Sequence, residues 1–132
     1  MLDHIGLPVE NYAKSKAFYE KALAPLGISL VMEVTPEMTG GEDSACGFGA
    51  AGKPFFWIGP GQRLGNHVHV AFTAANRREV DAFYKAAIAA GGRDNGAPGL
   101  RPHYHKDYYG GFVLDLDGHN IEAVCHAPAD KS

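Results

Sequence analysis

The chain has few of the features that mark several common protein classes. Its two cysteines, Cys46 and Cys125, are too few for a disulfide framework, and their apolar surroundings predict buried thiols rather than ligands or redox groups. No apolar run reaches the roughly 20 residues that a membrane helix needs. The net charge of −3 gives no reason to expect a nucleic acid or an anionic membrane as partner. The sequence also starts without a charged-then-apolar signal pattern, which predicts a cytoplasmic protein.

The most informative positive feature is an internal repeat. Adding 65 to the number of His4 gives His69, and the same offset places Asn11 on Asn76. From His4 to Gly27 the match to His69–Gly92 runs without a gap, and it includes the pairs Ala17/Ala82, Phe18/Phe83, Tyr19/Tyr84, Ala22/Ala87, Ala24/Ala89 and Gly27/Gly92. Aromatic and glycine matches could recur for packing reasons alone. A histidine at the start of each copy is harder to explain that way.

Each copy has the pattern expected of a strand, a helix and three further strands. Asn11 and Asn76 are N-cap residues, and glycines at 27 and 91–92 end the two helices. The predicted strands of the first copy lie at 1–9, 28–34, 45–48 and 54–58, and those of the second at 67–73, 92–95, 112–116 and 120–125. The segments at 35–41 and 59–65 are expected to be loops.

These patterns predict an α+β fold in one domain spanning residues 1–126, built from two βαβββ modules at about 1–62 and 66–126. A helix with one apolar stripe and a four-stranded sheet must each cover one face. Pairing of the modules meets this need, with helices on one side and the opposite faces enclosing a metal-binding cavity.

Three side chains are candidate metal ligands. His4 and His69 are equivalent in the repeat, and Glu122 lies between Ile121 and Ala123 in the last predicted strand. A buried carboxylate is costly unless it is paired, and a cation would offset that cost. Two histidines and one carboxylate with open positions suit Fe(II) and other divalent ions. Taken singly, each histidine could be an ordinary strand-end residue, and Glu122 could face water from an edge strand.

Four short motifs together resemble the vicinal oxygen chelate superfamily of glyoxalases, bleomycin resistance proteins and extradiol dioxygenases. They are His4-Ile5-Gly6, His69-Val70-Ala71-Phe72, Asp115-Leu116-Asp117-Gly118 and Asn120-Ile121-Glu122. The resemblance covers about residues 2–126 and agrees with the paired βαβββ fold. It implies a divalent metal ion (Fe, Mn, Zn or Ni) on His4, His69 and Glu122, a small oxygen-rich substrate that chelates this metal, and a homodimer.

The resemblance also marks a departure from glyoxalase I, which has a fourth protein ligand, a glutamate in the last strand of its first module. The offset of 65 puts Trp57 at that position, and alignment of the turn glycines Gly52 and Gly118 puts Phe56 there. Neither aromatic side chain binds a metal. The comparison therefore argues against glyoxalase I activity, and we expect Phe56 and Trp57 to contribute to substrate binding instead.

A second unusual stretch, residues 101–111, contains two histidines and three tyrosines. Side chains with an aromatic body and a polar tip suit a pocket for a small polar molecule. We expect His103 and Tyr108 to bind substrate and His105 and Tyr109 to act in catalysis, with a histidine as general base. The alternative is that the tyrosines only fill the cavity mouth or a dimer interface. This segment resembles a glyoxalase-like subgroup without an assigned substrate.

The sequence thus predicts a metal-dependent glyoxalase-like enzyme of lyase, isomerase or dioxygenase type. In this superfamily such a metal stabilises an enolate or oxyanion, or activates dioxygen. The alternative is a metal-independent small-molecule binding protein of the bleomycin-resistance type. The small size, with a single pair of modules, weighs against an extradiol dioxygenase.

Overall fold

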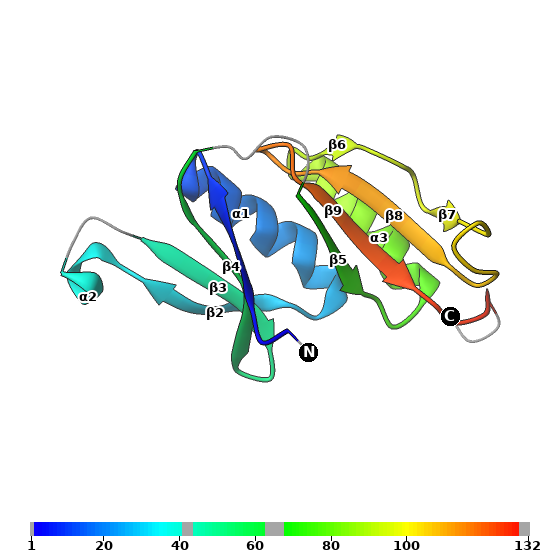
Figure 1. Ribbon diagram of the computed structural model, residues 1–132, viewed down its shortest axis with the longest axis horizontal. Helices are drawn as coiled ribbons and strands as arrows, with labels where there is room; N and C mark the ends of the chain where they lie inside the picture. Colours follow the sequence, from blue (N-terminus) through cyan, green and yellow to red (C-terminus); the bar gives the residue numbers. More distant parts are fainter. Residues whose placement is uncertain (1, 41–43, 63–67, 130–132) are drawn as a thin grey trace.

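The computed structural model describes residues 2–40, 44–62 and 68–129 and contains two separate sheets, one for each copy of the repeat (Figure 1). The first module consists of β1 (Ile5–Val9), α1 (Tyr12–Leu23), η1 (Ala24–Leu26), β2 (Ser29–Val34), α2 (Pro36–Thr39), β3 (Ala45–Ala50) and β4 (Lys53–Pro60). Its strand order is β1-β4-β3-β2, with β1 parallel to β4 and the other neighbours antiparallel.

The second module repeats this arrangement. It consists of β5 (His69–Thr73), α3 (Arg77–Ala89), β6 (Arg93–Asp94), β7 (Gly99–Leu100), β8 (Tyr109–Leu114) and β9 (Asn120–Cys125). The order is β5-β9-β8-β6, with β7 also paired to β8, and β5 runs parallel to β9. The prediction of an α+β fold with two paired βαβββ modules is therefore confirmed.

The local signals at the helix ends work as expected from the sequence. Asn11 Oδ1 accepts a hydrogen bond from the Lys14 N–H at 3.0 Å, and Asn76 Oδ1 accepts one from the Glu79 N–H at 2.8 Å. Each bond satisfies a backbone donor that has no partner within the first turn of the helix. Gly27 ends η1 with a φ of 76°, a left-handed conformation that glycine adopts without a steric penalty.

Two short elements differ from the sequence prediction. The segment 35–41, expected to be a loop, contains the one-turn helix α2, because Pro36 fits the first helical position and Gly40 takes the left-handed conformation at its end. Strand β7 was not predicted, since two residues are too short to show a periodic pattern. The predicted strand start at His67 and part of the 59–65 connector lie outside the described residues.

The strand register decides between the two alignments of the repeat. Gly6 lies opposite Trp57 in the pair β1–β4, and Ala71 lies opposite Glu122 in the pair β5–β9. The offset of 65 relates both residues of the first pair to those of the second. Trp57, and not Phe56, is therefore the structural equivalent of Glu122.

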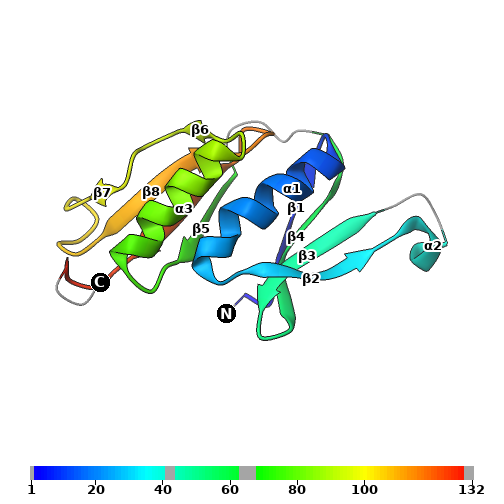
Figure 2. The same cartoon turned by 180° about the vertical axis from the view of Figure 1, so that it is seen from behind.

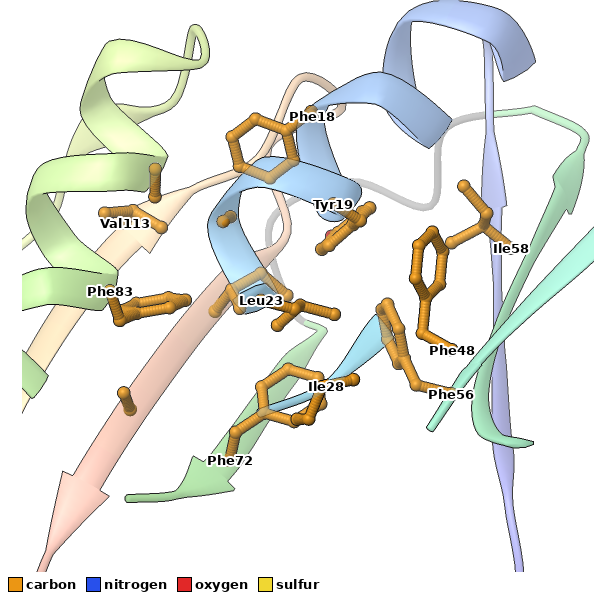
Figure 3. Packing of buried hydrophobic residues seen from close by; sticks show 14 of the residues in the cluster. Phe18, Tyr19, Leu23, Ile28, Phe48, Phe56, Ile58, Phe72, Phe83 and Val113 are labelled. Atoms are coloured by element: carbon orange, nitrogen blue, oxygen red, sulfur yellow. The ribbon is translucent and has the colours of Figure 1, made fainter. Parts of the chain in front are cut away.

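The two modules are joined through their helices. Figure 2 shows α1 and α3 side by side on the same side of the molecule, covering one face of both sheets. The core between them is aromatic: the Phe56 and Phe72 rings, one from each sheet, lie 5.2 Å apart in an edge-to-face arrangement (Figure 3). Within the described parts of the chain, no strand of one sheet pairs with a strand of the other, and the sheet faces turned away from the helices remain open.

Among the described residues, no helix is both long enough and apolar enough to cross a membrane.

Candidate functional site

Strand β9 carries Glu122 on the open face of the second sheet. Ile121, Ala123 and Cys125 belong to the core against the helices, and side chains alternate between the two faces of a strand. Glu122 therefore points away from the helices, yet only 1% of its surface is exposed. A carboxylate that is buried this deeply needs partners that satisfy its oxygens.

His69 is the first of these partners. It begins β5, next to β9, and its Nε2 lies 2.9 Å from Glu122 Oε1. The His69 side chain is 48% exposed, so the pair is covered on one side and open on the other. Phe112, opposite Glu122 in β8, extends the same face with its ring 6.2 Å from that of His69. The two ligand candidates of the second module thus lie side by side.

Tyr108 is the second partner of Glu122. Its hydroxyl donates a hydrogen bond to Glu122 Oε2, the oxygen that His69 does not contact. Burial, followed by this hydrogen bond, raises the pKa of the Tyr108 phenol well above its ordinary value, so the group remains a donor at neutral pH. A Cβ at Gly110 would lie only 3.1 Å from Glu122 Oε2 and 3.2 Å from the Tyr108 ring. The absence of a side chain at Gly110 therefore gives this pair its room.

The segment before Tyr108 is held against the end of β9 by two histidines. His105 Nε2 lies 2.8 Å from His126 Nδ1, and the two rings stack with centroids 5.0 Å apart. His105 Nδ1 accepts a hydrogen bond from the Asp107 N–H at 3.0 Å. Both nitrogens of His105 are thus engaged, and its ring meets that of Tyr108, the partner of Glu122, edge-on at 6.0 Å. His103 is exposed and packs on Tyr104.

The start of β8 lies against the end of β9. Tyr109 lies opposite Cys125 and Gly110 opposite Val124. Tyr109 itself is turned to the helix side, where its hydroxyl donates to Asp81 Oδ1 at 2.6 Å, and burial raises its pKa to about 12. The structure therefore does not bring Tyr109 to the Glu122 site, and its catalytic role stays a prediction.

His4 lies away from the other two ligand candidates. It directly precedes β1, its side chain is 60% exposed, and its Nδ1 is 2.8 Å from Asp3 Oδ1. β1 and β5 run in opposite directions, so their starting ends lie far apart (Figure 1). No group of three ligand atoms within 4.8 Å of one another includes His4, His69 or Glu122 among the described residues. One chain in this arrangement brings two of the three candidates together.

Phe56 and Trp57 lie on opposite faces of the first sheet. Phe56 is fully buried against α1, where its ring contacts those of Tyr19 and Phe48, and it also borders a cavity of about 430 Å³ beside His4. Trp57 is half-buried on the open face, where a Cβ at Gly47 would lie 2.9 Å from its ring. Trp57 is thus the residue of this pair that a molecule on the open face would meet.

A second polar group was not singled out from the sequence as a site. Asp115, Asp117 and His119, in the turn between β8 and β9, are buried and offer ligand atoms within 4.8 Å of one another, which makes them a possible carboxylate and histidine metal site. The carboxylate oxygens and His119 Nε2 also contact protein groups, whereas His119 Nδ1 is buried without a hydrogen-bond partner. Asp115 Oδ1 accepts the N–H groups of residues 117 and 119, and Asp117 Oδ1 accepts the Glu10 N–H at 2.8 Å.

The remaining contacts of this turn reach the first module. Tyr19 donates its hydroxyl proton to Asp115 Oδ2, Ser15 donates to Asp117 Oδ2, and His119 Nε2 lies 3.1 Å from the Pro8 carbonyl oxygen. Since the carboxylate oxygens already accept protein donors, the group acts as a polar seam between the modules. The Asp-Leu-Asp-Gly-His spacing inside a hairpin was the available sequence signal.

A family model described as the Glyoxalase/Bleomycin resistance protein/Dioxygenase superfamily matches residues 1–123. Among curated proteins there is no match. Among solved structures, a glyoxalase/bleomycin resistance protein from Albidiferax ferrireducens is similar with 26% identity and a TM-score of 0.77, over 95% of this chain and 98% of that one.

Two further structures share the fold at lower identity. A point mutant of the fosfomycin resistance protein FosX from Listeria monocytogenes has 21% identity and a TM-score of 0.67, over 94% of this chain and 88% of that one. A point mutant of glyoxalase I from Zea mays has 20% identity and a TM-score of 0.69, over 93% of this chain and 46% of that one.

Proposed function

Because the chain belongs to the glyoxalase/bleomycin resistance protein/dioxygenase superfamily, we propose that it is a metal-dependent enzyme acting on a small, oxygen-rich substrate. The observation that carries the proposal is the buried Glu122 carboxylate beside His69 on an open sheet face. His69, Glu122 and His4 are the proposed ligands of a divalent ion.

The donor set and its spacing fit such an ion. Imidazole nitrogen and carboxylate oxygen bind divalent metals at about 2.0–2.2 Å, so two neighbouring ligands at a right angle are about 3 Å apart. His69 Nε2 and Glu122 Oε1 are already 2.9 Å apart. When bound, a divalent ion would supply Lewis acidity to adjacent oxygens of the substrate. Burial of Glu122 keeps its carboxylate desolvated, which strengthens its attraction for a cation.

His4 is proposed to come from a second copy of the chain. The starting ends of β1 and β5 lie far apart within one molecule, both strands are sheet edges, and among the described residues neither sheet pairs with the other. Exposed edges and faces of this kind are suited to pairing with another chain. A homodimer that sets the first module of one copy over the second module of the other would complete the three-ligand site twice.

The remaining predicted residues would form the walls of this shared site. Trp57 of the opposing module would face the metal from the position equivalent to Glu122, with Phe56 supporting it from the core. Tyr108, His105 and His103 would line the mouth. His105 is the proposed general base, and in that role its Nδ1 would accept a substrate proton in place of the Asp107 N–H. The FosX structure contains Mn(II) and 1S,2S-dihydroxypropylphosphonic acid, and we carry over from it only a small oxygen-rich ligand as the type of substrate.

A second candidate function rests on a specific observation. Both oxygens of Glu122 already have protein donors, His69 and Tyr108, so the site is stable without a cation. A metal-independent binding protein of the bleomycin-resistance type would have such a site.

Elemental analysis of protein purified without chelator, followed by titration with Mn²⁺, decides between the two candidates. The enzyme proposal expects one bound ion per chain and its loss in His69→Ala. Absence of specific binding of any first-row divalent ion by the wild-type protein would favour the binding protein. His105→Ala should lower activity on a substrate, once identified, while metal content is nearly unchanged.

Mixing two variants tests the shared site. His4→Ala and Glu122→Gln should each lose the metal in isolation. In exchanged heterodimers, one site combines the intact His4 of one chain with the intact His69 and Glu122 of the other, so about a quarter of all sites should recover after random exchange. Ligands from a single chain would give no recovery.

A further inference from the structure

The Tyr108 hydroxyl donates a hydrogen bond to one of the two oxygens of Glu122, the proposed carboxylate ligand. Glu122 has two oxygens, and each has a different partner: His69 Nε2 at Oε1 and the Tyr108 hydroxyl at Oε2. If His69 and Glu122 hold the ion, the contact between them is the one that the ion replaces. The Tyr108 contact lies on the other oxygen and has no reason to break. This inference rests on the proposed function.

We propose that Tyr108 is a positioning residue that fixes Glu122 as a one-oxygen metal ligand through Oε1. A carboxylate without this bond is free to rotate and bind a cation through both oxygens, which takes up one more coordination position. By holding Oε2, Tyr108 keeps that position available for a substrate oxygen. Partners of this kind beside a metal ligand typically change metal affinity by about 10- to 100-fold.

Tyr108 is itself held by two ring contacts and two backbone hydrogen bonds, as this role requires. Its ring meets His126 edge-on at 5.2 Å and Tyr104 at 4.9 Å. Its carbonyl oxygen accepts the Arg101 N–H at 2.7 Å, and its own N–H donates to the His105 carbonyl oxygen at 3.1 Å. The bond between His105 and His126 ties this loop to the end of β9, the strand that carries Glu122. The loop that carries the Tyr108 hydroxyl is therefore anchored to the same strand that carries the Glu122 carboxylate.

Gly110 leaves the space that the hydrogen bond between Tyr108 and Glu122 needs. A methyl group there would lie within 3.1–3.2 Å of both Glu122 Oε2 and the Tyr108 ring, closer than an ordinary contact. Gly110→Ala should therefore disturb the same hydrogen bond without removing the hydroxyl. Two different substitutions are thus expected to give one signature.

The test measures metal affinity and coordination in Tyr108→Phe, with Tyr84→Phe as the matched control. Tyr84 also donates to a carboxylate, Asp94 Oδ1 at 2.9 Å, but on the helix side of the molecule. Tyr108→Phe should weaken Mn²⁺ binding about 10-fold, and the visible absorption of the Co²⁺ form should change towards a higher coordination number. Tyr84→Phe should leave both unchanged.

The outcomes separate this inference from the proposed function. If the wild-type protein binds no metal, the proposed function fails, and this inference fails with it. If the wild type binds metal and Tyr108→Phe matches it in affinity and spectrum, only the role of Tyr108 is overturned. Should Tyr108→Phe fail to fold by circular dichroism, Gly110→Ala decides, because an unchanged spectrum in that variant also overturns the role.

Discussion

The two modules share buried residues of their helices and differ at equivalent positions on the open faces of their sheets. Phe18 and Ala22 of α1 have the buried counterparts Phe83 and Ala87 in α3. On the other side of the sheets, the position held by Glu122 in the second module is held by Trp57 in the first. Packing around a helix layer constrains the first set in both copies. The open face has no such constraint, so one copy can carry a carboxylate ligand while the other carries an aromatic wall.

The largest expected effect tests the buried helix residues that the two modules share. Phe18→Ala and Phe83→Ala should each lower the free energy of unfolding by about 3–5 kcal/mol, because both rings are buried and leave a cavity. Urea unfolding monitored by circular dichroism measures both. A cost below about 1 kcal/mol for either variant would mean that the two helices are not equivalent in the core.

The next effect tests the equivalent open-face positions at which the modules differ, Glu122 and Trp57. Glu122→Gln should weaken divalent metal binding by at least about 100-fold, because an amide does not supply the negative charge that a hard or borderline cation needs. Trp57→Phe should leave the metal affinity unchanged. Isothermal titration with Mn²⁺ measures both variants. An equal loss of Mn²⁺ affinity in the two would show that both equivalent positions contribute to metal binding.

A pH-dependent prediction separates the equivalent tyrosines Tyr19 and Tyr84. Burial, followed by the neighbouring Asp115, raises the pKa of Tyr19 well above its ordinary value, so the folded protein keeps a proton that the unfolded chain releases above about pH 10. Stability from this group is complete below that pH and is lost as the pH rises further. Tyr19→Phe should therefore show a shallower alkaline loss of stability.

At neutral pH the same variant should be less stable by about 1–3 kcal/mol, because Asp115 loses a donor in a buried place. Tyr84→Phe, which removes a hydroxyl bound to the exposed Asp94, should change the neutral stability much less. Thermal unfolding between about pH 6 and 11 provides both comparisons. Identical alkaline slopes for wild type and Tyr19→Phe would contradict the assignment.

The smallest effect concerns the two helix caps. Asn11→Ala and Asn76→Ala should each cost about 1 kcal/mol, because each removes the acceptor for one first-turn N–H. The Asn76 variant also leaves in place the Glu79 side chain, which accepts the Ala75 N–H at 2.9 Å. Denaturation midpoints measure the two costs, and a cap that costs nothing would show that water replaces it.

The fold was largely predictable because its signals are local and occur twice. Asparagine caps, glycine stops and apolar alternation indicated the order of the elements, and the strand register agrees with the offset of 65. The burial of Glu122 followed from its apolar neighbours Ile121 and Ala123. The short elements α2 and β7 were missed because one turn of helix or two strand residues leave no periodic pattern.

The site was less predictable because it depends on how the modules are placed. A periodic pattern assigns a side chain to a face of its own sheet, but it does not say which other sheet that face meets. The remote position of His4 and the bond between His105 and His126 are consequences of that placement. His126 was also overlooked since it stands alone after the last strand, where no motif includes it.

The polar seam around the β8–β9 turn has a consequence for synthesis on the ribosome. Asp117 receives its hydrogen bonds from Glu10 and Ser15, and His119 reaches the Pro8 carbonyl oxygen, so residues near the start of the chain contact residues near its end. The first module therefore leaves the ribosome long before Asp117 and His119, the residues that bind its polar groups at this seam. We expect it to remain loosely packed until the β8–β9 hairpin has left the exit tunnel, so that the two modules fold as one unit.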